Sequence, residues 1–420
     1  MTPSLLKATA EPDSWHQRDQ SAEFALLAGL ALLPGRGLVQ DIAVIVRDGV
    51  IAEVREGAAA DELPPSRLDL TAGTLLPGLV DSHAHLSFSS GPDPAADVAS
   101  ESDISLGLRA AHNAQLALVS GVTTVADCGA RGGVVVELER AIADGLTSGP
   151  RILACGAPIT TTAGHCAWLG GCADSPEEVI REARRQVAGG ADFLKVMMTG
   201  GNITPGSNPA MLQYPPAVIY ALAAEARRLG RPLVAHAHSE EAVRVAAAAG
   251  VTIVAHGTCR SPEGIGLQPA TLAALVSAGT VVDPTITVGM PASGAAVSSE
   301  RQRMRAEMLP VFATMAGAGV PLLAGSDAGV PDVRHDSAGR AVLALHADVG
   351  LALDTALQAA TSEAARALGL SGLTGSIAPG LAADLVQIDA DLRVRPAALL
   401  RPAKVWLSGQ LVSAGGSLLL

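Results

Sequence analysis

Between about residues 76 and 369, eight short apolar runs alternate with stretches rich in alanine, arginine and glutamate. The runs include PLVAHAH and VTIVAH, and the stretches between them include PEEVIREARRQVAGG and PAVIYALAAEARRLG. Near-continuous apolar runs are typical of parallel strands that helices cover on both faces. Eight successive strand–helix units therefore predict an α/β fold, a distorted (β/α)₈ barrel of the TIM type. An open doubly wound sheet is the alternative, but no glycine-rich nucleotide fingerprint follows the first run.

Both ends of the chain carry a different pattern, in which short β-type runs are separated by turn signals. Near the start, IAVIVRDGVIAEV contains Asp48-Gly49, a dipeptide typical of a hairpin turn. Near the end, ADLVQID and KVWLSGQLVS repeat this pattern, with Gly409 at the turn. We therefore predict three parts: a flexible extension at 1–20, a small β-sandwich domain built from 21–75 and 375–420, and the barrel at 76–374.

Composition excludes several classes of protein. The formal net charge is −12, whereas a nucleic-acid partner would require a basic stripe. No apolar run reaches the roughly 18 residues that a membrane span requires. The run at 24–34 ends in Pro-Gly, so we interpret it as a strand rather than a signal peptide. The five cysteines are odd in number and form no CxxC pair, which favours a reducing, cytoplasmic location.

Polar residues gather where four of the apolar runs end. In a barrel, side chains at the carboxyl ends of the strands point into the active-site face. His83 and His85 lie two apart on the first run, so both imidazoles share one face and can reach one cation. An isolated HxH is weak evidence, but the chain has only ten histidines, and half of them end these runs together with an aspartate: His83, His85, His236, His238, His256 and Asp327.

One of only three lysines, Lys195, lies inside the apolar run DFLKVMM. A buried ammonium is costly unless it is paired or neutralised, so one interpretation is an ion pair with a neighbouring aspartate. The other is a desolvated lysine with a lowered pKa, whose nucleophilic amine reacts with CO₂ to form a carbamate. A carbamate can bridge two cations as a carboxylate does. Because histidines and an aspartate accompany this lysine in the predicted barrel, we favour the carbamate.

The order HxH, Lys, His, His, Asp at successive strand ends resembles the amidohydrolase superfamily. The segment LKVMMTGGNITPGSN, followed by Gln213, VAHAH and AGVTIVAHG, is similar to one branch of it. That branch contains Xaa-Pro dipeptidases, ochratoxin-cleaving amidohydrolases and imidazolonepropionase-like proteins. The resemblance covers almost the whole chain after residue 20. Its metal motifs are highly specific, whereas the residues that define the substrate are not.

The resemblance implies two divalent metal ions with a hydroxide between them. Zinc is the default expectation for histidine and carboxylate ligands, and manganese or iron would also fit. Asp327 would act both as a ligand and as the group that carries the hydroxide proton to the leaving amine. The implied ligands are His83, His85 and Asp327 for one ion, His236 and His256 for the other, and N6-carboxylated Lys195 as the bridge.

Three further residues are candidates for substrate contact. His165, in ITTTAGHCAWLGG after the third run, resembles the family histidine that polarises the scissile carbonyl and stabilises the oxyanion. The resemblance implies that His236 is the ligand and that His238 occupies a more variable position, so we expect His238 to line the pocket. Tyr214 follows the glycine-rich loop and could contact a substrate carboxylate, although core packing explains a tyrosine there equally well.

These features predict a metal-dependent hydrolase that cleaves an amide bond in a small peptide-like substrate. We expect a dipeptidase- or carboxypeptidase-like activity, or removal of a C-terminal follower from a modified natural-product peptide. Ring opening of a cyclic amide of the imidazolone type is an alternative, and a non-catalytic binding barrel is a remote one. The expected partner is a small molecule or peptide, with no nucleic acid and no membrane, and a homo-oligomer is compatible with the resemblance.

Overall fold

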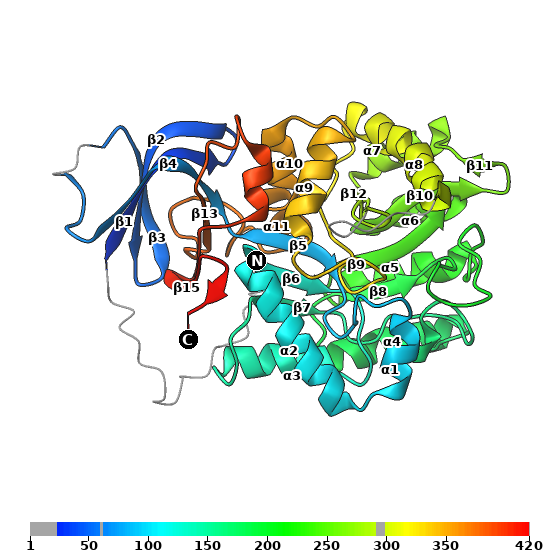
Figure 1. The fold of residues 1–420 in the computed structure, drawn as a ribbon. Helices are drawn as coiled ribbons and strands as arrows, with labels where there is room; N and C mark the ends of the chain where they lie inside the picture. Colours follow the sequence, from blue (N-terminus) through cyan, green and yellow to red (C-terminus); the bar gives the residue numbers. More distant parts are fainter. Residues whose placement is uncertain (1–22, 59–61, 291–298, 420) are drawn as a thin grey trace.

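The computed structural model describes residues 23–58, 62–290 and 299–419, so the predicted extension at 1–20 lies outside the described residues. The chain has a mixed α/β fold (Figure 1). One eight-stranded sheet takes strands from both chain ends in the order β16-β15-β14-β13-β4-β1-β2-β3. Its strands are β1 (Phe24–Leu33), β2 (Gly37–Arg47), β3 (Val50–Glu56), β4 (Arg67–Pro77), β13 (Leu385–Ile388), β14 (Lys404–Leu407), β15 (Gln410–Ala414) and β16 (Ser417–Leu418).

The two chain ends meet where β4 pairs antiparallel with β13, so that Leu76 faces Val386. One hydrophobic cluster joins Leu26 and Leu75 from the first strands to Trp406 from β14. At the β2–β3 turn, Asp48 and Gly49 adopt φ values of 51° and 76°, which the predicted tight hairpin requires. Among the described residues these strands form one continuous sheet, so the division into two facing sheets and the domain limits stay predictions.

The middle of the chain contains two parallel sheets. The first consists of β5 (Leu79–Ala84), β6 (Val122–Asp127) and β7 (Arg151–Ala154). The second consists of β8 (Leu194–Met197), β9 (Leu233–Ser239), β10 (Ile253–Ser261) and β12 (Val281–Asp283), with the short β11 (Gly264–Ile265) antiparallel to β10. The first seven predicted runs thus supply parallel strands.

The eighth run, residues 320–327, differs from the prediction because it forms no continuous strand. A single parallel bridge joins Leu322 of this run to Val282, and another joins Ala328, just beyond the run, to Ala84. A further parallel bridge, outside this run, joins Ile159 to Val196. No bridge forms between Leu322 and Ala328, and Asp327 at the end of the run has a φ of 54°, which an extended strand does not allow. No sheet in the described part of the chain is closed.

Helices cover the parallel sheets as predicted (Figure 1). Residue Ser175 caps the amino end of α4 in a reciprocal capping box with Glu178, and Pro176 occupies its first turn. The helices are α1 (Pro94–Ser100), α2 (Asp103–Val119), α3 (Val134–Ala143), α4 (Pro176–Ala188), α5 (Pro216–Arg228), α6 (Glu240–Ala249), α7 (Pro269–Ala278), α8 (Ser299–Gly317), α9 (Ala338–Ala347), α10 (Leu353–Ala359) and α11 (Ser362–Ala367). Short 3₁₀ helices span Ala167–Leu169 and Pro396–Leu400.

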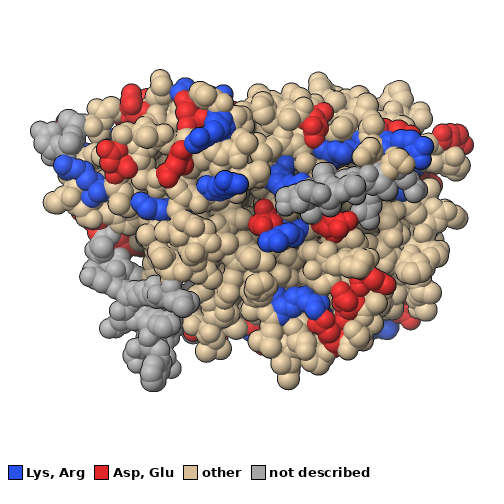
Figure 2. All heavy atoms as spheres, viewed as in Figure 1, with Lys and Arg blue, Asp and Glu red and all other residues tan. Residues whose placement is uncertain are grey.

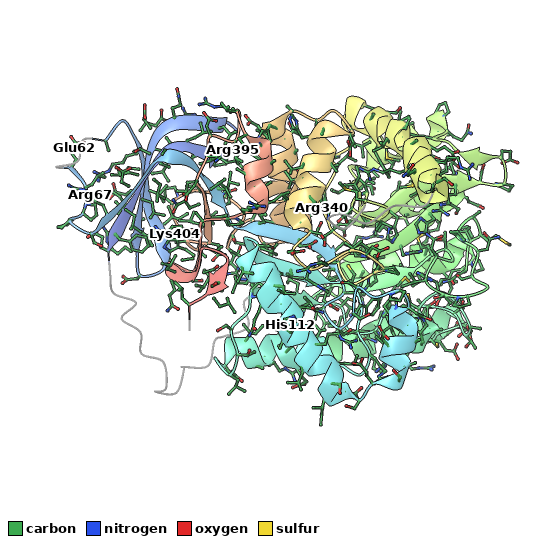
Figure 3. The ribbon with its side chains drawn as sticks, in the orientation of Figure 1. Glu62, Arg67, His112, Arg340, Arg395 and Lys404 are labelled. Carbon is green, nitrogen blue, oxygen red and sulfur yellow. The ribbon has the colours of Figure 1, made fainter. Side chains whose placement is uncertain are left out.

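The surface in view mixes acidic and basic side chains without a uniform basic stripe (Figure 2). None of the helices in the described ranges is long and apolar enough to cross a membrane. Figure 3 places Lys404 at the eight-stranded sheet and His112 on α2. Lys195, by contrast, lies in β8 and is only 1% exposed, so the buried setting predicted for it is observed.

Candidate metal centre

The end of β5 is held against the segment that carries Asp327. The backbone N–H of Asp327 donates to the carbonyl of His83 at 2.7 Å, and that of His85 donates to the carbonyl of Ala328 at 2.8 Å. A ring nitrogen of His335 lies 3.0 Å from the His85 carbonyl oxygen. These contacts fix both histidines of the HxH motif beside the aspartate, although 242 or more residues separate them in sequence.

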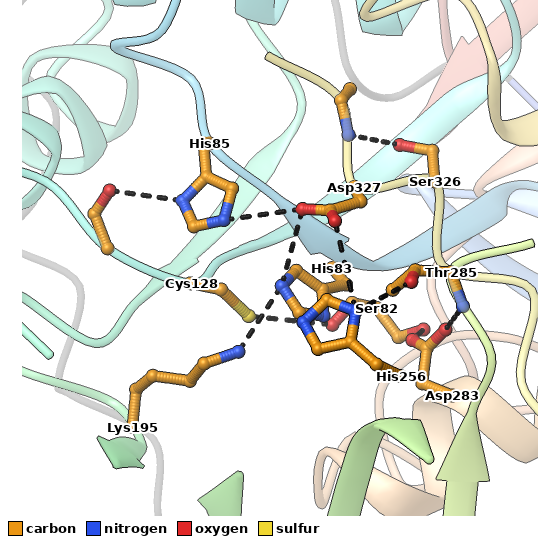
Figure 4. A network of polar contacts seen from close by, with 12 residues as sticks. Ser82, His83, His85, Cys128, Lys195, His256, Asp283, Thr285, Ser326 and Asp327 are labelled. Atoms are coloured by element: carbon orange, nitrogen blue, oxygen red, sulfur yellow. Dashed lines mark hydrogen bonds and ion pairs between the residues drawn. The ribbon is translucent and has the colours of Figure 1, made fainter. Parts of the chain in front are cut away.

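His83, His85 and Asp327 form the first cluster of potential metal ligands, and all three are buried (Figure 4). The Oδ1 atom of Asp327 lies 3.6 Å from His83 Nε2 and 3.4 Å from His85 Nε2. One ligand atom from each residue falls within 4.8 Å of the others, which is close enough for all three to contact one ion. The ring of His85 stacks on Phe88 with centroids 4.5 Å apart, which fixes its orientation.

His236, His238 and His256 form the second cluster, also buried, with ligand atoms within 4.8 Å of one another. It follows from the pairing of β9 with β10, in which His236 faces Ala255 and His256 faces Ala237. The three rings form a compact triangle, with centroids 4.5 Å apart for His236 and His256, 4.6 Å for His238 and His256, and 4.7 Å for His236 and His238. The structure therefore groups His238 with the histidines that the sequence assigned to the second ion.

Asp327 faces both clusters, and Lys195 contacts the first of them. The second carboxylate oxygen of Asp327 lies 3.9 Å from His256 Nδ1, while the first faces His83 and His85. Lys195 Nζ lies 3.2 Å from His83 Nε2 (Figure 4). Among the described residues Lys195 makes no ion pair with a carboxylate, so the predicted alternative of a structural ion pair finds no partner there.

Two of these ligand candidates sit on unusual backbone. His256 has a φ of 68° and Asp327 a φ of 54°, in the left-handed region that side chains other than glycine rarely adopt. Each such residue costs about 1–3 kcal/mol and persists only where the surroundings hold it. Here Thr285 Oγ1 holds His256 Nδ1 at 2.8 Å, and β5 holds the Asp327 backbone. The fold thus holds the His256 and Asp327 side chains in the orientation that places them with the other potential ligands.

Burial sets the protonation of the site. Desolvation lowers the pKa of four histidines well below the usual value, so the imidazoles are neutral: His83, His236, His238 and His256. Burial alone would raise the pKa of Asp327, but its interactions with His83, His85 and Lys195 bring it to about 2. Neutral imidazoles and an ionised carboxylate are the forms that bind divalent cations. Buried His83 Nδ1 also has no hydrogen-bond partner among the described residues.

His165 lies at the same cavity, after β7, and its ring centroid is 4.5 Å from that of His236. Its Nδ1 atom lies 3.0 Å from Thr204 Oγ1, and its backbone N–H donates to Gln213. Burial lowers its pKa to about 4, which keeps the ring neutral.

Tyr214 is not brought to the cavity: it is buried in the core, and its hydroxyl donates to the Ala173 carbonyl at 2.7 Å. Of the two interpretations of Tyr214, this placement matches core packing.

Sequence reasoning missed three buried aspartates beneath the clusters. Asp81 accepts hydrogen bonds from the backbone and hydroxyl of Ser326, directly before Asp327. Asp283 accepts from Ser82, directly before His83. Asp127 accepts from the backbone of Leu86 and Gly129, and its burial, like that of Asp81 and Asp283, raises its pKa. Each of these aspartates follows or ends an apolar run, and this position was the sequence feature that could have identified it. Each also holds a segment that carries a ligand candidate.

Both clusters open into one cavity of about 600 Å³, a size typical of sites for small molecules. Lys195 and His165 also line it, together with apolar side chains that include Val288, Met304 and Met308. The cavity is therefore lined by both clusters of potential metal ligands, and part of its wall is apolar.

A parallel α/β frame with two adjoining clusters of buried histidines and a shared carboxylate is typical of hydrolases that bind metal ions. The chain belongs to the amidohydrolase family, whose sequence profile matches residues 74–412. The resemblance drawn from the motifs is thereby confirmed.

Individual relatives agree with this assignment. The chain is 28% identical to ochratoxinase of Aspergillus niger, in an alignment that covers 95% of this chain and 88% of that protein. A solved structure of a prolidase complexed with N-methylphosphonate-L-proline is 25% identical, with a TM-score of 0.81, and covers 94% of this chain and 100% of that one. A putative prolidase from Bifidobacterium longum is 26% identical, with a TM-score of 0.77, over 94% and 96%. The chain is therefore a hydrolytic enzyme that acts on amide bonds.

Proposed function

We propose that the chain is a binuclear metallohydrolase that cleaves an amide bond in a small peptide-like substrate. The observation that carries this proposal is the position of Asp327, whose two carboxylate oxygens face different histidine clusters. A carboxylate in that place can bind an ion in one cluster with one oxygen and exchange a proton with the reacting groups through the other. The named relatives, an ochratoxinase and prolidases, support a dipeptidase- or carboxypeptidase-like reaction.

The residues present fit two divalent ions, with zinc as the default and manganese or iron as alternatives. His83, His85 and Asp327 would hold one ion, and His236 and His256 the other. Bound there, the two ions would activate water and polarise the scissile carbonyl. In N6-carboxylation, the neutral amine of Lys195 adds to CO₂, a new N–C bond forms and a proton leaves. The resulting carbamate would offer carboxylate oxygens to the ions, a ligand that the unmodified lysine cannot supply.

The protein side chains then carry out the remaining steps. Asp327 accepts a proton from the attacking water and donates it to the amine of the leaving group. His165, held by Thr204 and Gln213, donates a hydrogen bond to the carbonyl oxygen as negative charge develops there. His238, stacked on His256, lines the substrate side.

We also propose that the two parallel sheets and the bridged segment at 322–328 form a distorted (β/α)₈ barrel, with the site at the carboxyl ends of its strands. In support, single parallel bridges continue the pairing at both ends of the second sheet and from Ala84 to Ala328. Cytoplasmic action on a small molecule or peptide, in general catabolism or in the maturation of a modified peptide, belongs to the same proposal.

Metal removal tests this function directly. Protein purified without chelator is expected to contain about two ions per chain by elemental analysis, and to release an amine from members of a library of dipeptides and N-acyl amino acids. Prolonged chelation should abolish hydrolysis, and added zinc or manganese should restore it. One ion per chain would contradict the binuclear site, and hydrolysis that survives complete metal removal would contradict the mechanism. Gain of one water by cyclic amides without amine release would instead support the ring-opening alternative.

The position of His165 gives a second test, through Gly201. A Cβ atom at Gly201 would lie 2.3 Å from His165 Nε2, and the ring is too buried to move aside freely. Gly201→Ala should therefore displace the ring and lower kcat by up to about 100-fold. Bound metal should stay unchanged, because His165 is not among the proposed ligands.

Gly266→Ala is the matched control, because nothing lies within 4 Å of a Cβ there and the backbone is not left-handed. The control should keep kcat near that of the wild type. If Gly201→Ala has wild-type kcat at the same metal content, His165 has no part in stabilising the oxyanion.

A further inference from the structure

Arg260 lies on the wall of the same cavity and was assigned no role by the sequence motifs. It follows His256 on β10, and the register of β10 against β9 shifts between these two residues. Within the shift, Gly257 and Cys259 have φ values of 57° and 51°. An irregularity of this kind turns side chains away from the positions that regular alternation would give them. It brings the guanidinium of Arg260 to the cavity that holds both histidine clusters.

The contacts of Arg260 are unusual for a partly buried cation. Its Nη2 lies 3.0 Å from the Sδ atom of Met304, a weak acceptor. Its Nε is buried without a hydrogen-bond partner among the described residues. No ion pair joins Arg260 to an aspartate or glutamate in the described part of the chain. The protein thus leaves a guanidinium at a substrate-sized cavity without a counterion.

Arg305, which lines the same cavity, provides a comparison because its guanidinium has hydrogen-bond partners. It donates to the carboxylate of Asp348 at 2.5 Å and to the carbonyl of Ile286 at 2.6 Å. Burial lowers the pKa of Arg260, and no carboxylate acts in the opposite direction. Arg260 and His238 both line this cavity, and the charge of Arg260 contributes to lowering the pKa of His238.

Removing a cation from water without a partner is costly, so a group that enters the cavity gains by supplying the missing negative charge. A guanidinium recognises a planar carboxylate through two parallel hydrogen bonds. Part of the cavity wall is apolar, because Met304, which contacts Arg260, lines it together with Met308 and Val288. A carboxylate next to an apolar side chain matches both features.

We propose that Arg260 binds a carboxylate of the substrate and so restricts the enzyme to N-acyl amino acids or short peptides that have a free carboxylate beside an apolar side chain. This inference rests on the proposed function, since it names the substrate class of the same site. It makes Arg260 a specificity-determining residue, in contact with the substrate but not with the bond that breaks.

The test compares each hydrolysed substrate with its carboxamide, which has the same shape without the charge. The metal-loaded wild type should prefer the free acid. Arg260→Met, whose apolar side chain can pack on Met304, should lower kcat/KM for the acid at least about 30-fold. The loss should appear mainly in KM, and hydrolysis of the carboxamide should change little. Arg260→Lys should retain part of the preference, because it keeps the charge and loses the paired geometry.

Arg305→Met is the control, because it removes an equal charge from the same cavity wall where the charge already has a partner. It should leave the ratio of acid to carboxamide hydrolysis near the wild-type value. If Arg260→Met keeps that ratio, or if Arg305→Met lowers it as much, the assignment to Arg260 is wrong.

A binding measurement separates this inference from the proposed function. Metal-free protein is titrated with N-acetyl-L-methionine and with its carboxamide by calorimetry. Tighter binding of the acid in the wild type, lost in Arg260→Met, would support the carboxylate site even if no library member is hydrolysed. Equal binding of both compounds would overturn it even if hydrolysis is observed.

Discussion

Asp327→Asn is expected to lower kcat by about 10²- to 10⁴-fold, the range that a positioned general acid or base contributes. The amide of asparagine cannot accept the proton from the attacking water or donate it to the leaving amine. One oxygen remains to face His83 and His85, so at least one ion should stay bound. The measurement is kcat on a hydrolysed library member, together with metal content for the same preparation.

The variant should fold, which makes the result interpretable. Asp327 has a φ of 54°, and asparagine adopts left-handed backbone more readily than most residues. The hydrogen bond from its backbone to the His83 carbonyl does not involve the side chain. We therefore expect circular dichroism and Tm of the metal-free form to stay close to those of the wild type.

Asp332→Asn provides a closely matched control. Asp332 follows in the same segment and also has left-handed backbone, with a φ of 67°, but it is exposed and outside both ligand clusters. The same chemical change there should leave kcat within about threefold, as for most surface substitutions. An unchanged rate in Asp327→Asn would rule out the proposed proton transfer.

The metal-site candidates could be predicted because strong physical constraints mark them in the sequence. Two histidines in an HxH motif share a face of a strand, and a lysine in a buried run requires a chemical explanation. The structure gathers these candidates because parallel strands end on one side of the fold. His236 and His238 also lie two apart on β9 and so share a face, and pairing of β9 with β10 brings His256 to them.

Other parts of the site depend on details that a sequence does not display. Asp81 and Asp283 end apolar runs just as a ligand would, and only their contacts with Ser326 and Ser82 show that they support neighbouring ligand candidates. The orientation of Arg260 follows from a register shift that residue alternation does not predict. The pattern of the eighth run predicts a strand, but the run forms a bridge only at Leu322 and ends in left-handed backbone at Asp327.

Lys195→Ala is expected to reduce bound metal from about two ions per chain to one or fewer, and to lower kcat by roughly 1,000-fold. The alanine side chain offers no atom that can carry a carbamate between the two clusters. Intact mass recorded gently in bicarbonate should show one added CO₂ in the wild type and none in the variant. A rise in Tm on adding metal, expected for an ion that binds the folded state, should shrink in the variant.

A rescue experiment and a control variant distinguish a bridging carbamate from a lysine whose side chain only fills space. Lys195 is among the largest fully buried side chains, so alanine leaves room beside His83 for a small carboxylate. Added formate or acetate should then restore part of the metal content and kcat. Lys404→Ala is the control, because Lys404 lies in β14 away from the cavity lining (Figure 3). The CO₂ adduct and both ions should persist in that control; if Lys195→Ala also keeps two ions and wild-type kcat, then Lys195 does not bridge the metals.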